Sequence, residues 1–143
     1  APYGGLLAGR QAVIERARTM AFQIGFGRIH KSGYLAAAGI VALEKMVNRL
    51  DEDHANARRL AEGIAGLLVP RIDLSKVQTN IVIFHVDRPG GAEQLVRECA
   101  ARKVKIHQIG PASIRCVTHK DVDREDIDRA LDAFREITRG WTG

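Results

Sequence analysis

The chain is poor in aromatic residues and cysteines and has no long apolar run. Only 5% of its 143 residues are aromatic, and no apolar stretch approaches the roughly 20 residues that a membrane span requires. Two thiols, Cys99 and Cys116, lie outside any C-x-x-C pair, and so few are typical of the reducing cytosol. No basic-then-apolar signal region opens the sequence. These absences predict a cytoplasmic globular protein without a disulfide.

The sequence also lacks the short motifs of several enzyme classes. It contains no G-x-G-x-x-G, Walker, G-x-S-x-G or H-E-x-x-H pattern, and its five histidines do not cluster, so we expect no metal site. We interpret His54 as a solvated residue at a helix start and His85 as a hydrogen-bonded core residue of a strand. His107 and His119 lie at predicted strand ends, from which either can face a cleft.

Positive charge is concentrated in the first third of the chain. The net charge is +5, and residues 1–49 hold seven Lys or Arg against two Glu, so the rest of the chain is neutral overall. Such an excess suits nucleic acid or a small anion such as a phosphate group. No RNA-binding aromatic signature or zinc spacing accompanies the charge, which argues against nucleic acid as the partner.

Helical periodicity dominates the first half of the sequence. Apolar residues recur at helical spacing over 10–23, and the spacing breaks at Gly25 and Gly27. An alanine-dense helix is predicted over 32–49, because alanine has the highest helix propensity. A third, amphipathic helix is predicted over 51–68 and ends before a proline.

Strands appear in the second half. Residues 77–86 (VQTNIVIFHV) are apolar and β-branched on both alternating sets, which predicts a strand buried on two faces. A helix over 92–102 and short strands at 104–107 and 113–118 follow. Asp123 is a favourable N-cap for a final helix, whose first turn carries two further acids.

This order of segments predicts an α+β fold. We expect an antiparallel or mixed sheet of about three strands, covered by helices. Residues 1–49 are expected to form a glycine-rich start and interdomain or interface helices, and residues 50–143 a small α+β domain.

Arg115 is the most suggestive single residue for a binding site. It alternates with Ile114 and Cys116 in a predicted strand, so it points to the opposite face from both. An arginine that is buried in an apolar strand needs a partner for its charge, and its planar guanidinium group can bind a carboxylate through two parallel hydrogen bonds. The pattern leaves two alternatives open, an internal ion pair and plain exposure at a sheet edge.

A second basic group, Arg28, His30 and Lys31, lies between two predicted helices. Helix N-termini with cations nearby bind phosphate well. The alternative interpretation is ordinary solvated charge in a loop.

Five short stretches of the sequence carry a resemblance to a known family. They are 1–9 (APYGGLLAG), 33–39 (GYLAAAG), 53–63 (DHANARRLAEG), 78–81 (QTNI) and 114–119 (IRCVTH). In this order they resemble the low-specificity L-threonine aldolases, within the aminotransferase-like (fold type I) pyridoxal phosphate (PLP) enzymes. The third stretch is the most specific, and the resemblance covers essentially the whole chain.

The resemblance implies the small C-terminal domain of a PLP-dependent lyase that forms a homotetramer, a dimer of dimers. Such enzymes cleave L-threonine or L-allo-threonine into glycine and acetaldehyde. By the resemblance Arg115 binds the substrate carboxylate, and Arg28, His30 or Lys31 contacts the cofactor phosphate, where the family usually has an arginine. The family's Schiff-base lysine, in a cofactor-binding large domain, is expected a few residues before Ala1.

None of the six lysines of this chain matches that Schiff-base position. PLP chemistry needs such a lysine, so the chain by itself is predicted to have no aldolase activity. Two alternative functions stay open at this point. One is a β-eliminating lyase of the same clan, and the other is a non-catalytic interaction or oligomerisation domain.

Overall fold

The computed structural model describes residues 7–25 and 33–141. The chain forms two compact units, Ala1–Asn48 and Arg49–Gly143, called here the N-terminal and C-terminal units. Within the described ranges, no helix is long and apolar enough to cross a membrane.

The N-terminal unit consists of short helices. Helix α1 (Gln11–Gln23) stops where Gly25 adopts a positive φ of 90°, a conformation that favours glycine and ends helices. Helix α2 (Gly33–Val41) passes directly into a π-helical turn, η2 (Ala42–Met46), where a continuous helix to residue 49 was predicted. None of these three elements buries a residue. The basic group Arg28, His30 and Lys31 lies outside the described residues.

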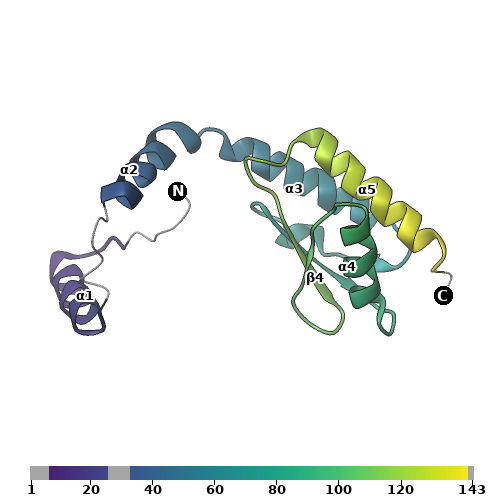
Figure 1. Ribbon diagram of the computed structural model, residues 1–143, viewed down its shortest axis with the longest axis horizontal. Coiled ribbons are helices and arrows are strands. Elements are labelled where there is room, and N and C mark those ends of the chain that lie inside the picture. Colours follow the sequence, from purple (N-terminus) through teal and green to yellow (C-terminus); the bar gives the residue numbers. More distant parts are fainter. Residues whose placement is uncertain (1–6, 26–32, 142–143) are drawn as a thin grey trace. The chain divides into compact units, whose positions relative to one another are not determined.

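The C-terminal unit contains three longer helices, α3 (Leu50–Ala65), α4 (Gly91–Ala101) and α5 (Arg124–Arg139). Figure 1 shows α3 and α5 running side by side with the sheet beneath them. Gly63 allows this close approach, because a Cβ atom at its position would overlap the buried Leu131 side chain of α5. Helix α3 ends three residues earlier than predicted, and the segment after it leads into a strand.

The sheet has four strands, in the order β1-β2-β4-β3, and every neighbouring pair is antiparallel. The strands are β1 (Pro70–Arg71), β2 (Ile81–Val86), β3 (His107–Gln108) and β4 (Ser113–Val117), and a 3-10 turn, η3 (Leu74–Lys76), precedes β2. The α+β prediction is therefore confirmed, with one strand more than expected. Strand β1 was missed because two residues are too few to show a period.

The helices of the C-terminal unit cover one face of the sheet. Val82, Phe84 and Val86 of β2 are fully buried against them, while Ile81, Ile83 and His85 alternate onto the other face, called here the open face. The prediction that this strand is buried on two faces was wrong, as was the placement of His85 in the core. Apolar side chains occupy both alternating sets of β2, and the sequence pattern cannot tell which set the helices of the chain cover.

Aromatic and aliphatic side chains fill the core between helices and sheet. Phe84 of β2 meets Phe134 of α5 edge to face, with ring centroids 5.9 Å apart. Both free cysteines lie in this core, and burial raises the pKa of each thiol to about 12. The thiols are therefore protonated at neutral pH and pack as small apolar groups.

The predicted N-cap of the last helix is confirmed. The Asp123 carboxylate accepts a hydrogen bond from the Asp126 N–H (2.9 Å), and the Asp126 carboxylate accepts one from the Asp123 N–H (3.1 Å). The second bond, together with Arg129, holds the pKa of Asp126 below its ordinary value. A lowered carboxyl pKa means that this stabilisation is present at neutral pH and is lost as the pH falls through that pKa.

We expect Asp123→Ala to lower the free energy of unfolding by about 1 kcal/mol, because the Asp126 N–H in the first turn of α5 loses its acceptor. Urea unfolding followed by circular dichroism at pH 7 would measure the loss. Asp132→Ala, which removes an exposed carboxylate from the middle of the same helix, is the matched control and should change stability by less than about 0.5 kcal/mol. Equal losses in the two variants would contradict a capping role.

Candidate site on the open face of the sheet

Arg115 lies at the centre of the open face. Strand β4 is an interior strand, paired with β2 on one side and β3 on the other, so Arg115 is not at a sheet edge. The pairing register places Ile83 beside it on β2 and His107 beside it on β3. Ile114 and Cys116 point to the buried face, as the alternation predicted.

The Arg115 guanidinium has no partner among the described residues. No hydrogen bond or ion pair joins it to another described side chain, whereas most other arginines of the C-terminal unit are paired with acids, for example Arg71 with Asp87 at 2.8 Å. The internal ion pair that the sequence left open is therefore not formed within this part of the chain. An exposed, unpaired guanidinium on a rigid strand is available for an external carboxylate or phosphate.

The surroundings of Arg115 on this face are mainly apolar. Ile81, Ile83 and Val117 are each 43–44% exposed there. His85, which lies two residues along β2 from Ile83, shares a hydrogen bond with the Ser113 hydroxyl at 3.0 Å. This face can therefore hold the carboxylate of a ligand at Arg115 against a partly apolar background.

A groove of about 480 Å³ crosses the open face beside β2. Ile81, Ile83 and His85 form its floor, and the turn around η3 forms one wall. Lys76 of that turn is paired with Asp73 at 3.5 Å. Ile83, which pairs with Arg115 across the two strands, lines this groove, but Arg115 itself does not.

Three of the resemblance motifs meet in one hydrogen-bond network at the end of β4. The Thr118 side chain is buried, and its hydroxyl donates to the Asp53 carbonyl of α3 at 2.6 Å. Asn80, just before β2, donates its amide to the Thr118 carbonyl (2.8 Å) and accepts from the Thr118 N–H (3.0 Å). This clamp fixes the end of the strand that carries Arg115 to both β2 and α3.

The first turn of α3 is held by a further ion pair. Arg49 donates two hydrogen bonds to the nearly buried Asp53 carboxylate, at 3.1 and 3.2 Å, and these bonds raise the pKa of Arg49. Sequence reasoning did not single out Asp53, Asn80 or Thr118 as interacting residues. Asp53 and Thr118 are 65 positions apart in the sequence. Their presence in the motifs that carry the resemblance was the only feature of the sequence that could have indicated their importance.

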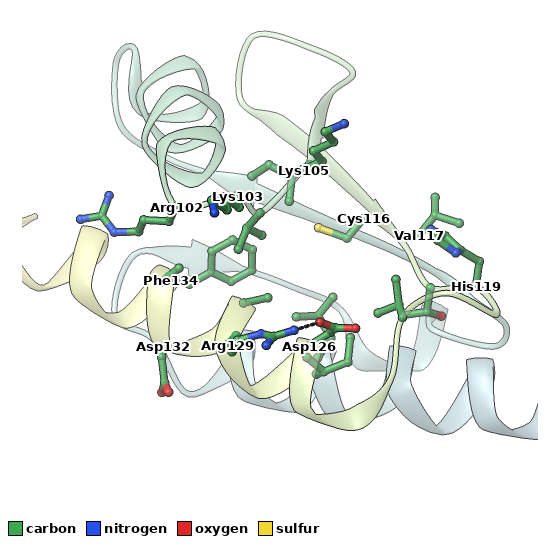
Figure 2. Close-up of a pocket in the computed structure, with 18 of the residues that line it drawn as sticks. Arg102, Lys103, Lys105, Cys116, Val117, His119, Asp126, Arg129, Asp132 and Phe134 are labelled. Carbon is green, nitrogen blue, oxygen red and sulfur yellow. Dashed lines mark hydrogen bonds and ion pairs between the residues drawn. The ribbon is translucent and has the colours of Figure 1, made fainter.

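A second hollow lies along α5, away from Arg115. This α5 cleft has a volume of about 720 Å³ and is bounded by α5, the segment 102–106 and the end of β4 from Cys116 to Asp121. Figure 2 shows Lys103 and Lys105 on one side and Asp126, Arg129 and Asp132 of α5 on the other, with Cys116 between them. His119 lines this cleft, whereas His107 faces Arg115.

No metal-binding cluster of three or more His, Cys, Asp or Glu exists among the residues that the structure describes. Of the predicted site residues, Arg115 is thus exposed and unpaired on the open face, and the Arg28, His30 and Lys31 group lies outside the described ranges.

The C-terminal unit is thus an antiparallel sheet covered on one face by three helices. Among solved structures, the chain is similar to the cystine C-S lyase C-DES in complex with its product cysteine persulfide. The TM-score is 0.57 at 22% identity, over 75% of this chain and 30% of that one. The likeness establishes the fold.

The chain belongs to the beta-eliminating lyase family, whose sequence model matches residues 1–88. Among curated proteins it is 41% identical to the low specificity L-threonine aldolase of Escherichia coli (strain K12), over 128 residues. It is 32% identical over 139 residues to the probable low-specificity L-threonine aldolase 2 of Arabidopsis thaliana. The matches cover 88% and 96% of this chain but only 36% and 39% of those proteins.

Proposed function

We propose that this chain contributes the substrate-carboxylate site to a PLP-dependent lyase that cleaves L-threonine or L-allo-threonine to glycine and acetaldehyde. The observation that carries the proposal is the unpaired, exposed guanidinium of Arg115 at the centre of the open face. A guanidinium fork binds a carboxylate by two parallel hydrogen bonds, which fixes the orientation of an amino acid as well as its position. The similarity to threonine aldolases supports the choice of substrate class.

The described residues of this chain serve binding and orientation in this proposal. The clamp of Thr118, Asn80 and Asp53 holds the backbone of β4, so that the Arg115 side chain starts from a fixed point. Ile83 and Val117 beside it exclude water from one side of a bound amino acid and strengthen the ion pair to its carboxylate.

In this proposal, none of the described lysines holds PLP. Lys76, on the wall of the open-face groove, is paired with Asp73, and Lys103 and Lys105 line the α5 cleft. PLP, when bound through a lysine, supplies the electron sink for cleavage of the substrate. Arg28, His30 and Lys31 are proposed for the anionic contact to its phosphate group.

The chain spans 36–39% of the length of the curated relatives compared above. We therefore propose that a cofactor-binding large domain, for which those longer relatives have sufficient length, supplies the cofactor lysine. This domain packs against the open face, and the enzyme is a homo-oligomer. The exposed Ile81, Ile83 and Val117 on that face would be covered in such an arrangement. The chain alone is then inactive.

A hybrid enzyme tests the proposal. In it, this chain replaces the matching segment of the E. coli low specificity L-threonine aldolase, to which it is 41% identical. We expect the hybrid to retain PLP and to release acetaldehyde from L-threonine, and the 143-residue chain alone to retain no PLP after gel filtration. Release would be followed with NADH and alcohol dehydrogenase. A folded, PLP-loaded hybrid that does not cleave L-threonine would overturn the proposed substrate.

The second candidate function is β-elimination, favoured by the family match over residues 1–88. Incubation of the same hybrid with L-cystine or L-cysteine, followed by measurement of pyruvate, separates the two reactions. Formation of pyruvate without acetaldehyde would mean that the enzyme catalyses β-elimination and not aldol cleavage. The proposed binding of the substrate carboxylate by Arg115 would be unaffected.

A further inference from the structure

The α5 cleft exposes an unpaired edge of strand β4. The Ser113 carbonyl accepts a hydrogen bond from Ile109 on the β3 side of β4 (2.9 Å), and the Thr118 N–H donates to Asn80 on the β2 side. Backbone groups alternate between the two sides of an antiparallel strand, so the N–H and carbonyl of Val117 point to the β3 side.

Strand β3, however, does not reach Val117. Extending the observed register by two residues would place Lys105 opposite Val117, but the ladder stops at the pair of His107 and Arg115. No backbone hydrogen bond joins Lys105 to Val117. The chain diverges from β4 over residues 103–106, and the cleft opens between them. The Val117 N–H is therefore a free donor at the cleft wall.

Four carboxylates and four Lys or Arg cations line the cleft, and two of these cations have no partner among the described residues. Every carboxylate that lines it is already paired with a cation: Asp121 with Lys120, Asp126 with Arg129, Asp132 with Arg135 and Glu136 with Arg102. Lys103 and Lys105 also line the cleft, and neither ammonium group is paired with a described residue.

The wall of the cleft between these charged rims is apolar. Val104, Ile106 and Val122 line it and remain partly exposed, and they pack over the buried side chains of Cys116 and Phe134. A volume of about 720 Å³ lies in the range of small-molecule sites, which combine apolar walls with a few polar contacts.

We propose that the α5 cleft is a binding site for a small organic monocarboxylate with an apolar chain. The carboxylate is held by the Val117 N–H and the ammonium groups of Lys103 and Lys105, and the apolar chain lies on the partly exposed Val104 and Ile106. The nearby acids favour a single negative charge over the double charge of a phosphate ester. Because Cys116 and Arg115 point to opposite faces of β4, this site is separate from the one proposed for catalysis.

Titration of the ¹⁵N-labelled 143-residue chain with hexanoate, followed by two-dimensional NMR, tests this site. We expect saturable shifts of the amide signals of Val117, Cys116 and Ile106, with the Val117 proton moving downfield as it acquires an acceptor. Hexylammonium, with the same chain and the opposite charge, should leave these signals in place. Acetate should bind at least about fivefold more weakly than hexanoate, because burial of four methylene groups is lost.

The double variant Lys103→Gln/Lys105→Gln should weaken hexanoate binding about fivefold, because two exposed ion pairs to the carboxylate are lost. Lys76→Gln, on the groove of the open face, is the matched control and should leave the affinity unchanged. Three results would overturn the proposal: no saturable shift near Val117 with hexanoate, equal affinity in the double variant, or tighter binding of hexyl phosphate than of hexanoate. None of these readouts depends on PLP or on cleavage of threonine.

Discussion

Replacing Arg115 by alanine in the hybrid enzyme is expected to raise KM for L-threonine about 100-fold, corresponding to roughly 3 kcal/mol for the loss of a hydrogen-bonded charge pair. The carboxylate of the substrate takes no part in bond cleavage, so its ion pair exists equally in the ground state and the transition state. Loss of such uniform binding raises KM and leaves kcat less affected. Initial rates of acetaldehyde release over a range of L-threonine concentrations would separate the two parameters.

Two further variants make the Arg115 result specific. Arg115→Lys keeps the charge but loses the two parallel hydrogen bonds, and should give a KM between those of the parent and the alanine variant. Arg71→Ala removes another exposed arginine from the same face, one already paired with Asp87 at 2.8 Å, and should leave KM unchanged. An equal rise in KM for the Arg71 and Arg115 variants would point to a general loss of positive charge and would contradict a carboxylate site at Arg115.

Leu95→Ala is expected to destabilise the C-terminal unit by about 3 kcal/mol. Leu95 of α4 is 1% exposed and belongs to the core between helices and sheet, so its truncation leaves a cavity that the neighbouring residues cannot fill completely. For a unit of this size such a loss lowers Tm by roughly 15 °C. Thermal unfolding followed by circular dichroism would measure it.

Leu68→Ala is the matched control for the core variant. Leu68 follows α3 and is fully exposed, so the same change of side chain should alter stability by less than about 0.5 kcal/mol. A similar fall in Tm for both leucines would mean that α4 does not pack on the sheet as described.

The open face explains why two expectations about β2 failed together. The sequence of β2 is apolar on both alternating sets, a pattern typical of a strand covered on two sides. The described helices cover one side only, so Ile81, Ile83 and His85 remain exposed. In the proposed function, the large domain covers this second side.

The central position of Arg115 could be predicted only in part. Alternation along residues 113–117 was sufficient to place the arginine opposite Ile114 and Cys116. It did not show that β4 is an interior strand, nor that Ile83 and His107 lie beside Arg115, because these depend on strand pairing.

Features that depend on neighbours along the chain can be predicted from the sequence alone. Helix α5 with its Asp123 cap, the helix at α4 and the side of β4 to which Arg115 points all follow from spacing and from local hydrogen bonding. The short motifs also sufficed to indicate the family. In each case the interacting groups are a few residues apart, so the physical cause lies within a short window of sequence.

Contacts between residues from distant parts of the chain depend on the tertiary structure. It brought Asp53, Asn80 and Thr118 into one clamp, left the Val117 edge of β4 unpaired beside Lys105, and stopped the helices at one face of the sheet. Contacts between residues 38 and 65 positions apart depend on strand order, register and the packing of helices as whole elements. A local pattern of apolar and polar residues is compatible with several such arrangements, and the packing of the complete core selects one of them.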